Sequence, residues 1–432
     1  MVPVGFGDHK VVGQDVPMSS EEPSGSRIVV VGTSLAGLRA AETLRQAGYE
    51  GEVIVVGEER HRPYDRPPLS KQLLAGDWEP DRIALRPADS FDDLDVGWRL
   101  GHRAVGVDLD ERRVELEGGD RVAFDGLIIA TGAAPRRIPG QEGSSIVHEL
   151  RTLDDALALR EELRGGGRRV VVVGAGFIGL EVAATAHRAG NEVVVLEGAE
   201  APLVRGLGVE MGTAIGELLI AAGIDIRCGV LVEALGADRV TLQGGEVVPA
   251  DVIVVGIGVA PVTGWLDGSG IARRDGVVCD ETLQVLDEAG ARIRGIYAAG
   301  DVARWTNAHF GEEMRVEHWT NAAEQGAVAA KNLLAELAGD AGEPYAAVPF
   351  FWSDQLDLRI QFLGRADPDG EVRVVAGAPA EGKFLALFER DGRLYGALGV
   401  NAPRWVMPMR KLLMDGSGWS EALDAAQELA QR

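Results

Sequence analysis

The chain has 432 residues, of which 46% are hydrophobic and 25% charged, and this length predicts about three domains with ordinary cores. Its formal net charge of −24 argues against nucleic acid and anionic membranes as general partners, and no targeting or membrane-spanning segment is visible. The two cysteines, Cys228 and Cys279, form no C-x-x-C pair and no disulfide framework, so we expect a cytoplasmic protein and two structural thiols.

The first segment of the chain, residues 1–26, is rich in glycine, proline, serine and acidic residues, and we expect it to be a disordered tail. Residues 27–58 then predict a strand–helix–strand unit that binds a dinucleotide. In this unit Gly32, Ser34 and Gly37 have the spacing of a G-x-G-x-x-G turn, which lets the backbone approach a pyrophosphate. Serine replaces the middle glycine and is small enough to keep the site.

A proline-rich segment follows, residues 61–71, with the sequence HRPYDRPPLSK. Three prolines forbid a regular helix, so we expect an extended loop that presents Arg66, Ser70 and Lys71. A solvated charged loop is the alternative. Further on, residues 125–132 read DGLIIATG, a short buried strand with a small-residue exit that suits a flat ligand.

A second strand–helix–strand unit, residues 169–197, carries the full motif. Gly174, Gly176 and Gly179 form the turn, and the acid Glu197 ends the second strand, where it would bond the ribose hydroxyls. Alignment of the two units puts Gly57, not Glu58, opposite this acid. We keep Glu58 as the ribose candidate of the first unit.

Three further elements surround these two units. Residues 251–261 predict a buried strand with a glycine-rich exit that includes Gly258, and residues 295–301 predict another that ends on Gly300 and Asp301. A carboxylate at the end of a parallel strand can accept bonds from sugar-alcohol hydroxyls, although it can also be a helix cap. Residues 320–337 predict a strong helix.

The last part of the chain changes character. Alternating apolar patterns between residues 349 and 400, with a turn signal at Asp391 and Gly392, predict antiparallel strands. Short helices are expected near residues 404–414 and 421–430. The fold class is therefore α/β, with two Rossmann-like dinucleotide-binding domains and a C-terminal α+β domain.

The motifs YDRPPLSK, IIATGA, GAGFIGLE, YAAGD, EHWTNA and FFWSDQ occur here in order. Together they resemble the NADH-dependent ferredoxin reductases, flavoproteins related to glutathione reductase that supply Rieske oxygenases and bacterial cytochromes P450. The resemblance implies FAD and NADH as cofactors and a small iron–sulfur ferredoxin as partner, for a monomer or homodimer. It implies an FAD domain at residues 27–143 and 276–344, an NAD domain at 144–275, and a reductase domain at 345–432.

The resemblance also implies roles for single residues. Gly32, Ser34 and Gly37 would hold the FAD pyrophosphate, and Gly174, Gly176 and Gly179 that of NADH, with Glu197 on its ribose. Asp301 would bond the ribityl chain. The residues expected around the flavin and the remaining nucleotide atoms are Glu58, Arg66, Lys71, Thr131, Gly132, Gly258, Gly300 and Trp319. A Lys71–Glu181 ion pair beside the flavin is a hypothesis, and its alternative is two solvated surface charges.

The acid Glu197 favours NADH over NADPH. An extra phosphate within about 4 Å of it would cost roughly 4 kcal/mol at an effective dielectric constant of about 20. No arginine lies between Gly198 and Val204 to offset that repulsion.

Electron exit is the step that distinguishes the possible functions. Disulfide reductases of this fold need a cysteine pair at the flavin, where this chain reads RPPLSK, so the electrons must leave directly. Trp319 and Trp352 are the candidates beside the exit, and the helix near Thr320 would point its N-terminus at the flavin. Basic candidates for docking a ferredoxin are Arg304, Arg404, Arg410 and Lys411. An NADH oxidase or quinone reductase, and a signalling flavoprotein resembling apoptosis-inducing factor, are the alternatives.

Overall fold

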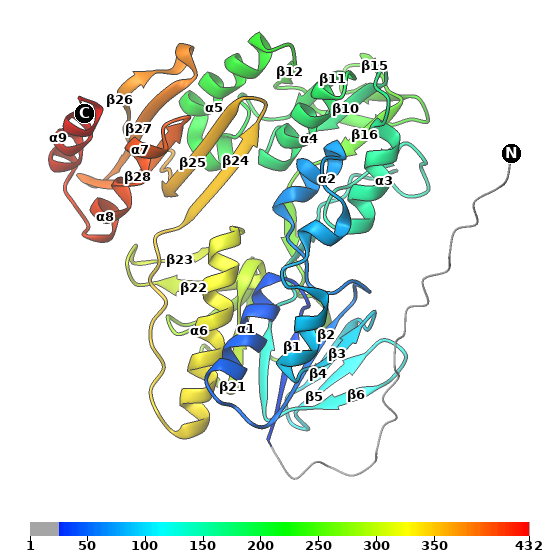
Figure 1. Cartoon of the computed structure of the whole chain (residues 1–432), viewed down its shortest axis with the longest axis vertical. Coiled ribbons are helices and arrows are strands. Elements are labelled where there is room, and N and C mark those ends of the chain that lie inside the picture. Colours follow the sequence, from blue (N-terminus) through cyan, green and yellow to red (C-terminus); the bar gives the residue numbers. More distant parts are fainter. Residues whose placement is uncertain (1–25, 432) are drawn as a thin grey trace, which may run out of the picture.

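The computed structural model describes residues 26–431, so the predicted tail, apart from Ser26, lies outside the described residues. The chain forms two bodies built on parallel strands and a third, C-terminal body built on an antiparallel sheet (Figure 1). None of the helices within residues 26–431 has the length and apolar character needed to cross a membrane.

The first body contains a mixed ten-stranded sheet in the order β23-β22-β19-β20-β21-β7-β1-β2-β3, with β18 paired to β19. Its strands come from two separate stretches of the chain, and β1 pairs in parallel with β2 and β7. The strand bounds are β1 Arg27–Val31, β2 Glu52–Gly57, β3 Gly97–Leu100, β7 Gly126–Ile129, β18 Arg273–Arg274, β19 Gly276–Cys279, β20 Gln284–Leu286, β21 Arg292–Ala298, β22 Ala303–Asn307 and β23 Glu312–Arg315.

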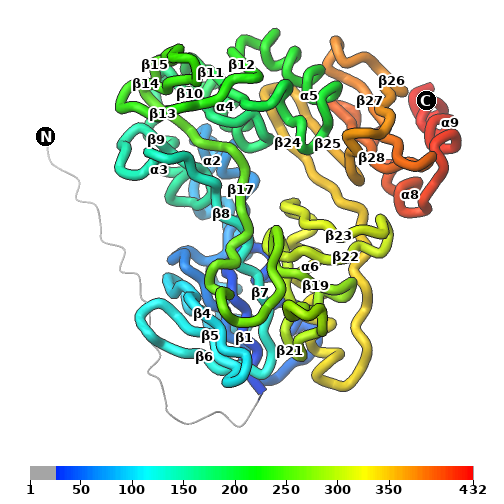
Figure 2. Tube along the Cα trace, turned by 180° about the vertical axis from the view of Figure 1, so that it is seen from behind, coloured from blue at the N-terminus to red at the C-terminus, as the bar shows by residue number. Residues whose placement is uncertain are grey.

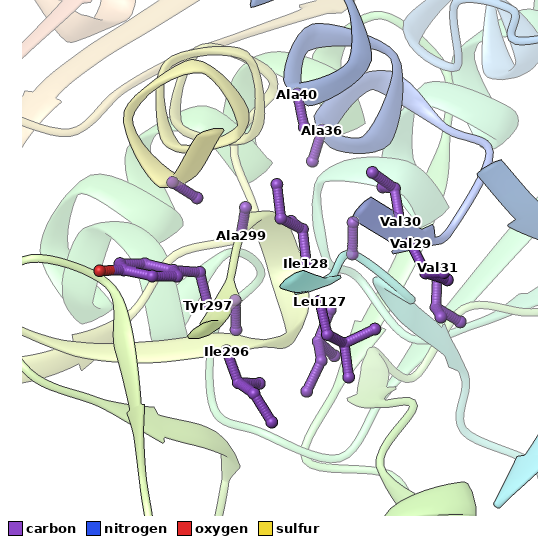
Figure 3. Close-up of a cluster of buried hydrophobic side chains, with 14 of the residues drawn as sticks. Val29, Val30, Val31, Ala36, Ala40, Leu127, Ile128, Ile296, Tyr297 and Ala299 are labelled. Atoms are coloured by element: carbon purple, nitrogen blue, oxygen red, sulfur yellow. The ribbon is translucent and has the colours of Figure 1, made fainter. Parts of the chain in front are cut away.

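The core of this body lies under two helices, α1 (Leu35–Gln46) and α6 (Trp319–Ala338), which pack side by side (Figure 1). The central strands are apolar beyond their first residues, since both faces of the sheet are covered there, and residues 28–31 of β1 and 127–129 of β7 are buried. Figure 3 shows Val30, Ile128 and Ala299 below Ala36 of α1. The helices approach closely through Gly326, where a Cβ atom would lie 2.3 Å from the Ala36 carbonyl oxygen.

The second body contains a parallel sheet in the order β12-β11-β10-β16-β9. Helix α3 begins with a capping box at Thr152, and α4 follows the strand β10 directly. The bounds are β9 Val147–His148, α3 Leu153–Leu163, β10 Arg169–Val173, α4 Phe177–Arg188, β11 Glu192–Glu197, α5 Val204–Ala221, β12 Asp225–Cys228 and β16 Val252–Val255.

Two short antiparallel strands, β8 (Ala133–Pro135) and β17 (Val259–Pro261), connect these bodies. Figure 2 shows both strands between the body that contains β7 and the one that contains β10. Each of the two bodies also carries an antiparallel three-stranded sheet. Their strands are β4 Ala104–Asp108, β5 Arg113–Leu116 and β6 Arg121–Ala123, and β13 Val232–Leu235, β14 Arg239–Leu242 and β15 Val247–Pro249.

The C-terminal body is an antiparallel sheet in the order β24-β25-β28-β27-β26 with three helices, as the alternating pattern predicts. Asp391 and Gly392 form the β27–β28 turn, both with positive φ. The helix expected over 404–414 is instead two short helices, because Pro408 cannot continue the first. The bounds are β24 Phe350–Gln355, β25 Leu358–Gly364, β26 Val372–Ala378, β27 Lys383–Arg390, β28 Arg393–Val400, α7 Pro403–Val406, α8 Met409–Met414 and α9 Trp419–Ala430.

The proline-rich segment differs from the expectation of an extended loop. Pro67–Ser70 forms a 3₁₀ turn and Gln72–Ala75 forms the short helix α2. Prolines are tolerated in the first turn of a helix, where their missing N–H groups would have no partner. The turn packs on α4 of the second body, where the Thr185 hydroxyl donates to the Ser70 carbonyl oxygen at 2.8 Å.

Candidate functional site

A large cleft of about 1960 Å³ runs between the three bodies. Both glycine turns open into it, as do the proline-rich segment, the start of α6 and the strand β24. Its volume exceeds the roughly 300–1,000 Å³ of a usual small-molecule site, as expected for a cleft that holds two dinucleotides.

The first glycine turn can be built only with glycine at its two ends. Gly32 has a φ of +129°, and a Cβ atom there would lie 2.0 Å from the Ala130 carbonyl oxygen. A Cβ atom at Gly37 would lie 1.8 Å from the Gly32 oxygen. Between them Ser34 is the N-cap of α1 with extended backbone, so the unpaired N–H groups of that helix point into the cleft. The turn fits a pyrophosphate.

Arg66 crosses from the proline-rich segment to this turn. Its guanidinium donates to the Ser34 hydroxyl at 2.7 Å, to Glu59 at 2.6 Å and to the Arg151 carbonyl oxygen. Tyr64 donates its phenol proton to the same Glu59 carboxylate. Burial lowers the pKa of Arg66, but the Tyr64 and Glu59 oxygens more than offset it and raise that pKa overall. Arg66 is thus a fixed cation beside the phosphate turn.

Sequence reasoning missed Glu59 and Tyr64 as parts of this site. It selected the adjacent Glu58, which also lines the cleft and whose side chain is 64% exposed and lies 3.8 Å from the exposed Arg103. The strand register pairs Val31 with Val56, which confirms that Gly57 has the position that Glu197 has in the second unit. A Cβ atom at Gly57 would lie 2.3 Å from the Thr33 hydroxyl, so no acid fits there.

The residues that follow β7 and β21 also line the cleft, next to the first glycine turn at the same edge of the sheet. Thr131 and Gly132 both line the cleft. Gly132 has a φ of +68°, and the Thr131 hydroxyl donates to the Val262 carbonyl oxygen at 2.8 Å. Asp301 accepts a hydrogen bond from Arg151 at 2.9 Å. At Gly300, with a φ of +79°, a Cβ atom would lie 3.0 Å from the Ala36 side chain.

The second glycine turn repeats the geometry of the first. Gly174 has a φ of +103°, and a Cβ atom there would lie 2.5 Å from the Gly256 oxygen. At Gly179 a Cβ atom would lie 2.2 Å from the Gly174 oxygen. Gly176, the N-cap of α4, faces open space, which leaves room for a phosphate at the helix N-terminus.

Glu197 folds back over this turn. One carboxylate oxygen accepts from the Ala175 N–H at 2.6 Å and the other from the Ala199 N–H at 2.8 Å. The carboxylate is therefore held at the end of β11, with further lone pairs free to accept ribose hydroxyls. This geometry fits the adenosine end of a nicotinamide dinucleotide.

Arg205 also lines the cleft, and the sequence argument missed it because that argument stopped at Val204. Its guanidinium lies 3.2 Å from the position of a Cβ atom on Gly258, whose φ is +98°. Gly258 follows β16, whereas Glu197 ends β11 on the other side of β10.

The predicted Lys71–Glu181 pair is present. The ammonium lies 2.9 Å from one carboxylate oxygen, and the Ser70 hydroxyl donates to the same oxygen at 2.5 Å. The second oxygen accepts from Ser353 of the C-terminal body at 2.7 Å. Glu181 is 6% exposed, so the alternative of two solvated surface charges is wrong. Ser353 was missed, because nothing local in the sequence links it to α4.

Trp319 begins α6 at the edge of the cleft. Its indole N–H donates to Asp65 at 2.6 Å, and its ring lies 6.2 Å from that of Trp352. Burial raises the pKa of Asp65. The N-cap residue His318 packs on Phe351 at 4.9 Å between ring centroids, and burial lowers its pKa to about 4, so its imidazole is neutral at pH 7.

Neither cysteine lines the cleft. Cys228 lies on β12 and the buried Cys279 on β19, and burial raises the pKa of both thiols. Both are structural, as predicted, and a thiol–disulfide step at this site is excluded. Within the described residues no cluster of histidine, cysteine or acidic side chains could hold a metal ion.

Comparison with known proteins gives two family matches. The model of the pyridine nucleotide-disulphide oxidoreductases matches residues 26–326, and that of the reductase C-terminal domain matches residues 350–431. The ferredoxin–NAD(+) reductase component of the anthranilate 1,2-dioxygenase system of Burkholderia cepacia is 36% identical over 91% of this chain and 95% of its own length. Rhodocoxin reductase of Rhodococcus erythropolis is 37% identical, over 89% of each chain.

A solved structure agrees with these matches. The covalent complex of putidaredoxin reductase with putidaredoxin superposes with a TM-score of 0.84 at 30% identity, over 94% of this chain and 99% of that one. The fold therefore matches, and FAD and NAD(H) are the cofactors. The chain belongs to the NADH-dependent ferredoxin reductases, FAD-containing members of the pyridine nucleotide-disulphide oxidoreductase family.

Proposed function

We propose that the protein takes a hydride from NADH and passes the electrons one at a time to a small iron–sulfur ferredoxin, which supplies a cytochrome P450 or a Rieske oxygenase. One observation carries this proposal: two dinucleotide turns open into one cleft that no cysteine lines. When bound, FAD supplies a ring that accepts two electrons with a hydride and releases them singly. Because no thiol lines the cleft to receive these electrons, an external acceptor must take them.

The proposal assigns each part of the cleft a role. Arg66, held by Glu59, stabilises the phosphates at the Ser34 turn, and Glu197 binds the ribose of NADH. Lys71 and Glu181 flank the flavin, and Trp319 lies at its edge, on the side where electrons leave. The residues proposed to contact the two nucleotides are Gly32, Ser34, Gly37, Glu58, Arg66, Lys71, Thr131, Gly132, Gly174, Gly176, Gly179, Glu197, Gly258, Gly300, Asp301 and Trp319.

A basic patch on the C-terminal body, formed by Arg404, Arg410 and Lys411, is the proposed docking site. All three side chains are exposed, and none forms an ion pair within residues 26–431. Arg304 differs, because Glu313 and Asp275 neutralise it. A ferredoxin is typically acidic, so a local positive patch is needed on a chain with a net charge of −24.

We also propose a cytoplasmic location. Both cysteines are free thiols in strands of the fold, so no disulfide depends on an oxidising compartment.

The test is anaerobic stopped-flow reduction of the FAD-loaded protein by NADH and by NADPH, followed by mixing with ferredoxins from the same cell. We expect fast bleaching by NADH and reoxidation by one ferredoxin far faster than by oxygen. If only oxygen or a quinone reoxidises the flavin quickly, the NADH oxidase or quinone reductase replaces this proposal. Slow reoxidation by every acceptor would instead favour the signalling flavoprotein.

A further inference from the structure

Strand β24 presents two different faces because side chains alternate along a strand. Phe350 and Trp352 lie on one face, with ring centroids 6.1 Å apart. The Trp352 ring also packs edge-to-face on the ring of Trp319. Phe351 lies on the other face and packs on Phe177 of α4, with 4.5 Å between the two ring centroids. Ser353 shares this second face and reaches the same helix, at Glu181. One strand of the C-terminal body thus touches both the aromatic pair and the ion pair.

The contact between Ser353 and Glu181 has a fixed direction. The Gln355 amide donates to the Ser353 oxygen at 3.1 Å, and the Ser353 hydroxyl donates its own proton to Glu181 at 2.7 Å. Ser353 and Gln355 are both 0% exposed, so neither bond is in contact with bulk water. The amide therefore leaves the hydroxyl proton free to point at the carboxylate.

The two oxygens of Glu181 are divided between two segments of the chain. One oxygen accepts from Ser70 and Lys71 of the proline-rich segment, which packs on α4, and the other accepts from Ser353 of the C-terminal body. Without Ser353 the second oxygen would be a buried acceptor with no partner, which is unfavourable for a carboxylate. The group would then rotate, and the Lys71 ammonium, whose side chain is 12% exposed, would follow it.

We propose that Ser353, locked by Gln355, is a positioning residue that fixes the Glu181 carboxylate and through it the Lys71 ammonium. The inference rests on the proposed function, because that function places the ion pair beside the flavin. The C-terminal body then has a role in hydride entry as well as in electron exit.

The test compares variants of the FAD-loaded protein. Ser353→Ala should lower the limiting rate of flavin bleaching by about 10- to 100-fold, the effect of one hydrogen bond to a charged group, with the dissociation constant of NADH little changed. The flavin midpoint potential should fall, because Glu181 loses a donor that offsets its charge. Ser353→Thr keeps the hydroxyl and should restore both values. Ser417→Ala, a buried serine that follows α8, is the matched control and should change neither.

Gln355→Met separates positioning from stability. It removes the amide that locks Ser353, and it also removes a buried carbonyl oxygen that has no partner among the described residues. We expect the bleaching rate to fall while the melting temperature stays equal or rises. Wild-type rate and potential in Ser353→Ala would overturn the inference, as would a loss of melting temperature alone. The flavin midpoint potential is measured without NADH or ferredoxin. An unchanged potential in Ser353→Ala therefore contradicts this inference without bearing on whether the protein reduces a ferredoxin.

Discussion

At the scale of single residues, the buried ion pair of Lys71 and Glu181 shows that the surroundings of a charge decide how much the charge contributes to stability. Two hydroxyl groups and one ammonium surround a carboxylate that is 6% exposed. Such a pair contributes little net stability, but removal of one partner leaves a buried charge. Net stability therefore does not account for the pair, and the proposed role of the two side chains beside the flavin does.

We expect Glu181→Gln to slow flavin bleaching at saturating NADH by about 10- to 100-fold, because Lys71 loses its counter-charge beside the reacting atoms. Stopped-flow absorbance measures this rate. The double variant Lys71→Glu with Glu181→Lys should not recover it, since Ser70 and Ser353 donate to a carboxylate at position 181. Hydride transfer and flavin potential left untouched by that swap would contradict the role.

His318 gives a pH dependence of a defined sign. Its pKa is lowered from 6.5 to about 4 by burial, so the unfolded chain binds more protons between these values and stability increases with pH across that window. The contribution is complete above about pH 6.5. From pH 7 to pH 5 the wild type should lose about 2 kcal/mol more of its unfolding free energy than His318→Gln does. Urea unfolding of both proteins at pH 7 and pH 5 measures this difference. Equal losses of unfolding free energy in the wild type and the variant would show that the His318 imidazole is hydrated in the folded protein.

At the scale of elements, β11 and the glycine turn together set the choice of nucleotide. Glu197 is held by the Ala175 and Ala199 N–H groups at the end of that strand. Arg205 lies beside Gly258, which follows β16, and we expect the acid rather than this arginine to dominate at the ribose.

We expect the wild type to prefer NADH over NADPH by about two to three orders of magnitude, from a repulsion of roughly 4 kcal/mol. Glu197→Gln removes the charge and should reduce the preference below about tenfold, as measured by kcat/KM with each nucleotide. Glu200→Gln, at an exposed acid three residues later, is the control and should keep the preference. A wild type that uses both nucleotides equally would refute the argument.

The features that the sequence predicts depend on residues close together in the chain, whereas the features that it misses are contacts between residues far apart in the chain. The apolar strands, the glycine turns and the displacement at Gly57 follow from local periodicity and spacing. The Ser353–Glu181 bond joins residues 172 positions apart, and the Trp319–Asp65 bond joins residues 254 apart. No local pattern contains either pairing. All four residues stand inside motifs of the resemblance, but a motif gives the residues of one segment and not their partners in another, and the Lys71–Glu181 pair is predicted from the family's known arrangement alone.

At the scale of the whole molecule, charge is distributed unevenly. The chain carries a net charge of −24, yet Arg404, Arg410 and Lys411 stand together on α7 and α8, beside the exposed Met407 and Met414. A basic patch with an apolar component is suited to transient docking of an acidic protein.

The variant Arg410→Glu with Lys411→Glu should raise the KM for an acidic ferredoxin by about tenfold or more and weaken its dependence on salt, because steering by the patch reverses. Reduction of ferricyanide, which needs no protein docking, should be unchanged. Arg239→Glu, an exposed arginine on β14 of the second body, is the control. Equal effects of both changes would place docking elsewhere.

The insertion of the second body between β7 and β19 has a consequence for synthesis. β7 needs β21 as its parallel neighbour, but the ribosome must first make all of β10, β11 and β16. At about 5–20 residues per second the unpaired edge of β7 waits on the order of 10 to 30 s. During that interval the inserted body has every strand of its own sheet, so it can complete its fold before the body that precedes it in the chain.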